Sequence, residues 1–155
     1  MPRVIISDTS VLILFQKINK LELLQGIYSE IITTPEVAEE YGDVLPDWII
    51  IQSVSDRKYQ EFLEIQIDKG EASAIALAKE YEEVLLLLDD LKARKLATKL
   101  NLKFTGVLGI IHRAKQTGII KKVKPLLDEI LNTDFHVSDK VIQELLKING
   151  ENGHM

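Results

Sequence analysis

The chain has 155 residues and a net charge of −5, with 46% hydrophobic and 28% charged residues. These values are ordinary for one compact globular domain with a substantial core. The chain has no cysteine, which excludes disulfides, thiolate chemistry and zinc sites built on cysteine. Its three histidines show no metal-ligand spacing.

Short apolar segments alternate with helical patterns along the chain. In the first half, strands are predicted at 4–6, 31–33 and 48–51, and helices at 11–16, 20–25, from 34 onward and at 56–67. Gly70 is expected to break the pattern before an Ala-rich helix at 71–81. In the second half, strands are predicted at 84–88 and 102–104, and helices at 91–100, 107–116, 125–132 and 138–148.

The predicted strands are apolar throughout rather than alternating. This pattern favours an α/β fold in which four or five mostly parallel strands form a sheet that helices cover on both faces. No repeat or interdomain linker is visible, so we expect one domain over residues 1–148 and a flexible C-terminal tail at 149–155. The apolar run before Asp8 is too short for a signal peptide or a membrane span, which predicts a cytoplasmic protein without membrane contact.

Acidic residues stand at the predicted ends of strands and starts of helices. Asp8 ends the first strand, Asp89 and Asp90 end the fourth, and Glu71 opens the helix that precedes it. Ligands of an open parallel sheet bind beyond the carboxyl ends of its strands, so these acids are expected near one another. Converging carboxylates repel, and a hard cation such as Mg²⁺ or Mn²⁺ relieves the repulsion.

Each of these acids has a simpler interpretation when it is taken alone. Asp8 fits an N-cap, Asp68 and Glu71 fit a capping box, and Asp89 or Asp90 fits the cap of the following helix. Glu36 is a first-turn acid that the helix dipole favours, and Glu40 shares its helix face. The set of acids, more than any member, predicts a metal site.

Basic residues concentrate in one segment of this acidic chain. Residues 92–124 contain ten Lys or Arg and no Asp or Glu. Such a charge split is typical of a polyanion partner, although solvated helix faces explain it equally well. Other chemistries lack support, because the chain has no Gly-rich phosphate-binding motif, no Ser nucleophile elbow and no acidic pair after the first strand of the kind a phospho-acceptor domain needs.

Four segments together resemble the PIN domain family. The segments are 4–10, ending in Asp8–Thr9–Ser10; 34–40, beginning Thr34–Pro35–Glu36; 70–78, beginning Gly70–Glu71; and 88–94, containing Asp89–Asp90. They are most similar to a small prokaryotic branch described only as predicted nucleic-acid-binding. The resemblance implies a three-layer α/β/α fold and an Mg²⁺- or Mn²⁺-dependent endoribonuclease, commonly the toxin of a toxin–antitoxin pair.

The resemblance also implies roles for individual residues. The implied catalytic acids and metal ligands are Asp8, Glu40, Glu71 and Asp89, with Asp90 as a further ligand. Glu40 is preferred because an aliphatic or aromatic residue follows the family's Glu, and Tyr41 follows Glu40. Glu39 is the alternative. Contacts to nucleic acid are expected from Thr9, Ser10, Lys92, Arg94, Lys95 and Arg113.

Two functional hypotheses follow. The first is a metal-dependent endoribonuclease with an RNA substrate, an antitoxin partner and, through its apolar helix residues, a homodimer. The second is a catalytically weak or inactive PIN-like module that binds nucleic acid or protein. The second hypothesis depends on the assignments of Glu40 and Glu71, because one misplaced acid can abolish metal binding. The third acid is Glu71, where many PIN domains have Asp, and this departure bears on the toxin role more than on the fold.

Overall fold

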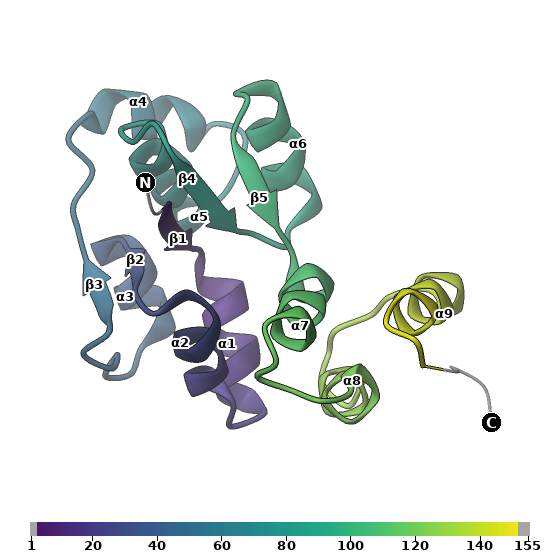
Figure 1. Ribbon diagram of the computed structural model, residues 1–155. Coiled ribbons are helices and arrows are strands. Elements are labelled where there is room, and N and C mark those ends of the chain that lie inside the picture. The colour runs from purple at the N-terminus through teal and green to yellow at the C-terminus, as the bar shows by residue number, and fades with distance from the viewer. Residues whose placement is uncertain (1–2, 152–155) are drawn as a thin grey trace.

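The computed structural model describes residues 3–151, which form a three-layer α/β/α fold (Figure 1). The central sheet is entirely parallel, with strand order β3-β2-β1-β4-β5. Its strands are β1 (Val4–Ser7), β2 (Ile31–Thr33), β3 (Ile49–Ile51), β4 (Val84–Leu87) and β5 (Lys103–Thr105). The predicted parallel α/β sheet is therefore confirmed.

Helices cover both faces of the sheet, because alternate residues of each buried strand point to opposite sides. Ile5, Leu85 and Leu87 pack into one core, while Ile6 and Leu86 pack into another. The first core includes residues of α1 (Thr9–Lys17), α2 (Leu21–Tyr28), α3 (Pro35–Tyr41) and α7 (Val107–Gln116). The second includes residues of α4 (Arg57–Leu63), α5 (Lys69–Ala78) and α6 (Leu91–Lys99).

A third core attaches the two last helices, α8 (Val123–Leu131) and α9 (Asp139–Ile148), to the sandwich. Their apolar residues pack against Leu14 of α1 and against Val107 and Ile111 of α7. Figure 1 shows both helices beyond α7, at one end of the molecule. Four apolar residues that follow Asp8 in α1, Val11, Leu12, Leu14 and Phe15, are buried within the chain's own cores, while Ile13 is partly exposed.

The structure corrects two predicted helix starts. Gly70 does not break the chain: α5 begins at Lys69, because Asp68 caps it, and Gly70 lies in its first turn. The helix predicted from Pro125 begins at Val123. Proline is tolerated there because first-turn N–H groups have no partner within the helix.

The last described residues contact the domain. The Glu151 carboxylate accepts hydrogen bonds from the Val123 and Lys124 backbone N–H groups at 2.7 and 3.1 Å, and it pairs with Lys115 at 2.9 Å. The sequence prediction placed residues 149–151 in a tail, whereas here Glu151 caps α8. Residues 152–155 of that predicted tail lie outside the described residues.

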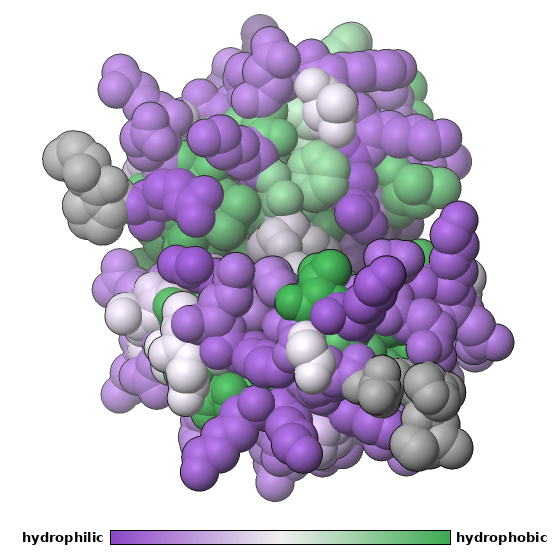
Figure 2. Space-filling model, turned by 45° about the vertical axis from the view of Figure 1, so that its right-hand side comes forward, coloured by the Kyte–Doolittle hydropathy of each residue, from purple (hydrophilic) through white to green (hydrophobic). Residues whose placement is uncertain are grey.

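The surface combines polar cover with scattered apolar side chains. Figure 2 shows a face that is mostly hydrophilic, with hydrophobic side chains visible between the polar ones. None of the helices within residues 3–151 has the length and apolar character needed to cross a membrane.

Candidate metal centre

The carboxyl ends of β1 and β4 lie side by side at the middle of the sheet. The two strands pair in parallel, with Ser7 opposite Leu87. The chain proceeds from β1 to β2 and β3 on one side, then returns to place β4 and β5 on the other, so the winding direction reverses between β1 and β4. Such a reversal is where open parallel sheets bind ligands. Asp8 directly follows β1, and Asp89 comes two residues after Leu87, the last residue of β4.

Asp8 is the most deeply buried acid of this rim, with no exposed surface. Its Oδ1 accepts a hydrogen bond from the Val11 N–H at 3.1 Å and so caps α1, while its Oδ2 is buried without a partner. Burial raises the pKa of Asp8 to about 7 despite that hydrogen bond, and the charges of Asp89, Asp68 and Asp90 add to the rise. Asp8 is therefore both a helix cap and an acid with one free oxygen.

Glu40 and Thr9 come together over Gly70. A Cβ atom on Gly70 would lie 2.8 Å from Glu40 Oε1 and 3.1 Å from Thr9 Oγ1. The Thr9 hydroxyl is buried and has no hydrogen-bond partner. The glycine thus leaves room for the carboxylate of Glu40, an exposed residue, to lie near the Thr9 side chain in the first turn of α1.

Glu71 is the second buried acid, with 8% of its surface exposed. Burial raises its pKa to about 8, and the charges of Asp68, Asp90 and Asp8 act in the same direction. Asp68 Oδ1 accepts from the Glu71 N–H at 2.9 Å, so the predicted cap is present. Asp68 also belongs to the acidic cluster, which sequence reasoning missed because it assigned this residue only to capping.

Asp89 and Asp90 have different surroundings. Asp89 Oδ1 accepts a hydrogen bond from the Val107 N–H at 3.1 Å and lies 3.9 Å from an Arg94 guanidinium nitrogen. Burial raises the pKa of Asp89 above its usual value. Asp90 is exposed and caps α6 through the Ala93 N–H at 3.0 Å.

Glu36 of α3 shares one feature with Asp8, because its Oε1 is buried without a hydrogen-bond partner. Glu36 Oε2 accepts from Gln60 at 2.8 Å and pairs with Arg57 at 3.2 Å. Burial acts to raise the pKa of Glu36, but the Gln60 hydrogen bond and the Arg57 charge outweigh it and hold the pKa low. Glu39 is exposed and lines the same hollow as Glu40 and Gly70.

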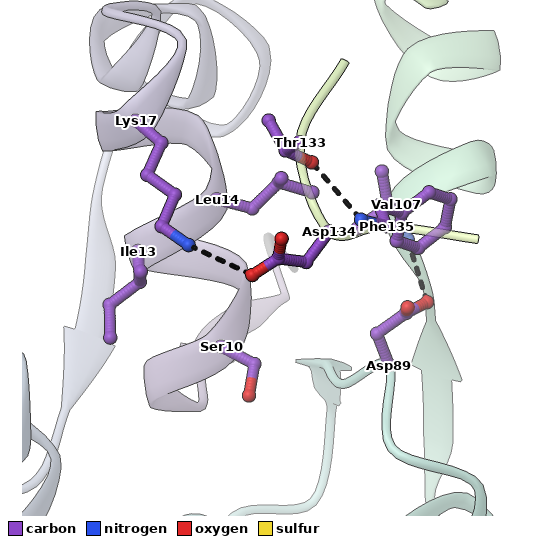
Figure 3. A pocket seen from close by; sticks show the side chains of 9 residues that line it. All are labelled: Ser10, Ile13, Leu14, Lys17, Asp89, Val107, Thr133, Asp134 and Phe135. Carbon is purple, nitrogen blue, oxygen red and sulfur yellow. Dashed lines mark hydrogen bonds and ion pairs between the residues drawn. The ribbon is translucent and has the colours of Figure 1, made fainter. Parts of the chain in front are cut away.

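The residues predicted to contact nucleic acid fall into two groups. Ser10 is exposed on α1 and lines a hollow together with Asp89 (Figure 3). Arg94 lies beside Asp89 and over the Phe104 ring, 5.2 Å from its centroid, while Lys92 and Lys95 are exposed on the same helix. Arg113 differs, because it is exposed in the last turn of α7 and its charge acts on Tyr28 rather than on the acids.

The oxygen atoms at the rim fit a hard divalent cation. Between residues 3 and 151, no three carboxylate or histidine side chains stand close enough together to hold one ion directly. Mg²⁺ does not require such a set, since it keeps several waters and binds proteins through one or two carboxylates. The unpartnered Asp8 Oδ2 and the neighbouring Thr9 hydroxyl are buried polar atoms of the kind that a hydrated cation satisfies.

The family model described as PIN domain matches residues 4–151. A search of curated proteins finds no match.

Proposed function

The chain belongs to the PIN domain family, a nuclease-type fold, and we propose that it is an Mg²⁺- or Mn²⁺-dependent endoribonuclease that hydrolyses RNA phosphodiester bonds. The observation that carries the proposal is Asp8, whose buried and unpartnered oxygen lies at the point where the sheet reverses its winding. PIN domains generally use divalent metals, and this rim offers the oxygen ligands that such ions prefer.

In this proposal one or two of the acids Asp8, Glu40, Glu71 and Asp89, led by Asp8, would bind the cation directly, and the others would hold it through its bound waters, with Asp90 as a further acid of the rim. When bound by these residues, such an ion would supply a water of lowered pKa and neutralise charge on the phosphate. The Val11 N–H fixes the Asp8 carboxylate through Oδ1, which leaves Oδ2 for the ion. Hydrolysis by water yields a 5′-phosphate and a 3′-hydroxyl.

The proposal also assigns RNA contacts to basic side chains of α6 and to a hydroxyl of α1. Arg94 lies 3.9 Å from Asp89, so it can bind a phosphate oxygen that reaches this acid. Lys92 and Lys95 are exposed on the same helix, and Ser10 is exposed at the start of α1. Their contacts would bind and orient the RNA backbone rather than take part in the reaction.

The test is cleavage of structured and single-stranded RNA in Mg²⁺, Mn²⁺ or EDTA. We expect cleavage with either ion, none in EDTA, and a loss of at least about a hundredfold in Asp8→Asn. Asp47→Asn, which removes an exposed acid from the segment before β3, serves as the matched control and should keep full activity. Cleavage that persists in EDTA or in Asp8→Asn would contradict the proposal.

A non-enzymatic role is the second candidate. It is favoured by one observation, namely that no three potential metal ligands converge within residues 3–151. Calorimetric titration with Mn²⁺ distinguishes the two functions, because binding that Asp8→Asn abolishes supports the enzyme. Two further proposals concern partners. A toxin role with an antitoxin partner is tested by co-purification with the product of the neighbouring gene. A homodimer is tested by light scattering.

A further inference from the structure

The connection between α8 and α9 passes beside the acidic rim. It contains Phe135, whose partly buried ring packs on the third core. The turn is held by two hydrogen bonds: the Phe135 N–H donates to the Thr133 hydroxyl at 3.2 Å, and that hydroxyl donates to the Ile130 carbonyl at 2.6 Å. The ring is therefore attached to a defined turn and does not depend on the exposed Asp134–Lys17 ion pair, which at 3.8 Å contributes little.

Two hollows meet at Phe135 and Asp89. The first, of about 290 Å³, lies between α1 and the connection and is also lined by Ser10, Leu14 and Lys17 (Figure 3). The second, of about 380 Å³, is also lined by Arg94, Gly106, His136 and Val141. Phe135 and Asp89 line both hollows, so the ring stands between two spaces that each reach the same acid.

The lining of these hollows suits nucleotides. Each combines apolar surface with one Lys or Arg that lies near a carboxylate: Lys17 pairs with Asp134 in the first, and Arg94 lies beside Asp89 in the second. Aromatic rings stack on the faces of unpaired bases, and cations bind the phosphates between them. Each hollow approaches or exceeds the lower end of the size range of small-ligand sites.

We propose that Phe135 separates two consecutive unpaired nucleotides of an RNA strand, one in each hollow, so that the phosphate joining them lies at Asp89. This inference rests on the proposed ribonuclease function and extends it to the form of the substrate. Bases held in a duplex cannot part around an inserted ring without losing their stacking and pairing. The protein therefore selects single-stranded RNA, and Phe135 acts as a positioning residue at the cleaved bond.

The experiment uses single-stranded RNA with a mapped cleavage position and the same RNA lacking the base on either side of that bond. With the wild-type protein we expect removal of either base to slow cleavage about tenfold, as base–aromatic contacts imply. Phe135→Ala should slow cleavage of intact RNA by at least a similar factor, slow cleavage of each RNA that lacks one base by less, because one stacked base remains, and have no further effect on RNA that lacks both bases. This non-additivity identifies the ring and the base as interacting partners.

Two further variants separate stacking from folding. Phe135→Leu keeps an apolar side chain on the third core but loses the aromatic face, so it should retain the melting temperature and share the cleavage defect. Phe62→Ala removes a 57% exposed ring of α4, which lines neither hollow, and should behave as wild type. Equal losses on intact and abasic RNA, or no loss in Phe135→Leu, would overturn the inference.

Binding provides a readout that does not depend on hydrolysis. Fluorescence anisotropy in Ca²⁺ should show single-stranded RNA bound about tenfold more tightly than its duplex, and Phe135→Leu should abolish that preference. If the wild-type protein cleaves no RNA in Mn²⁺ but shows this preference, the hydrolytic function fails and the inference about Phe135 stands. Equal binding of single strands and duplex contradicts the inference even where cleavage occurs.

Discussion

At the scale of single residues, Asp8 divides its carboxylate between structure and chemistry. One oxygen caps α1 and the other is buried without a partner. Sequence reasoning treated the helix cap and the metal ligand as competing explanations of this residue. In the structure they are compatible, because a carboxylate has two oxygens and the cap occupies only one of them.

The same residue makes the stability of the metal-free protein fall as the pH rises. The folded pKa of Asp8 is about 7 and its ordinary value is 3.8, so between these values the folded state holds a proton that the unfolded state has lost. Stability decreases with pH wherever the folded state binds more protons. Glu71, with a folded pKa of about 8 against 4.5, acts in the same direction. We expect a higher melting temperature in EDTA at pH 5.5 than at pH 8.5.

Neutralising Asp8 should reduce this pH dependence. In Asp8→Asn the amide oxygen still accepts from Val11, while the buried charge is removed. The variant should therefore melt above the wild type at pH 8.5 in EDTA, whereas Asp47→Asn should not. Mn²⁺ should reverse the order, because a bound ion stabilises only the protein that retains the carboxylate. A wild-type melting temperature that rises between pH 5.5 and 8.5 in EDTA contradicts this account.

At the scale of elements, the sequence predicts the sheet well because the strands are short and mostly aliphatic, and because acids follow β1 and β4. Val84 to Leu88 has the composition of a strand buried on both faces, and the structure confirms it. The start of α5 was wrong because a glycine near a helix end is a common break signal. Asp68 overrides that signal, and only the tertiary position of Glu40 explains why glycine is present.

A substitution at Gly70 is therefore predicted to weaken metal binding without lowering stability. Alanine favours a helix over glycine by about 0.5–1 kcal/mol, and the atom it would displace, Glu40 Oε1, ends a flexible side chain. Gly70→Ala should keep or slightly raise the melting temperature while weakening Mn²⁺ binding about tenfold, measured by calorimetry.

Gly26→Ala is the matched control for this substitution. Gly26 also lies inside a helix, α2, where an added Cβ would meet the Ile119 side chain at 3.2 Å, remote from the acids. It should alter stability by a similar small amount and leave Mn²⁺ affinity unchanged. Equal Mn²⁺ affinity in Gly70→Ala and wild type would contradict the assignment of Glu40 as a metal ligand.

At the scale of the whole molecule, the position of the chain's last described residues could not be predicted from local pattern. Glu151, which lies 28 residues beyond Val123 in the sequence, accepts hydrogen bonds from the N–H groups at the start of α8. No periodicity links positions so far apart, so local pattern could not predict this cap. The loop that carries Phe135 was missed for the same reason, since only the packing of α8 and α9 brings it to Asp89.

The Glu151 contact should contribute measurably to the stability of the whole domain. Its carboxylate satisfies two N–H groups at the start of α8 and pairs with Lys115 on α7, and it is only 11% exposed. Glu151→Gln retains one acceptor but loses the charge, so we expect a loss of about 1–2 kcal/mol in urea unfolding at pH 7. The variant Asp134→Asn disrupts only an exposed pair and should unfold as wild type does.

The pH dependence of that loss identifies its cause. Burial acts to raise the pKa of Glu151, but the Val123 hydrogen bond and Lys115 outweigh it, and the folded pKa lies below the usual 4.5. A lowered carboxyl pKa stabilises the fold above the unfolded pKa, and this contribution is lost as the pH falls through the folded value. The difference between wild type and Glu151→Gln should therefore be full at pH 7 and shrink below about pH 4. A difference that stays constant down to pH 3 would assign the loss to packing instead of charge.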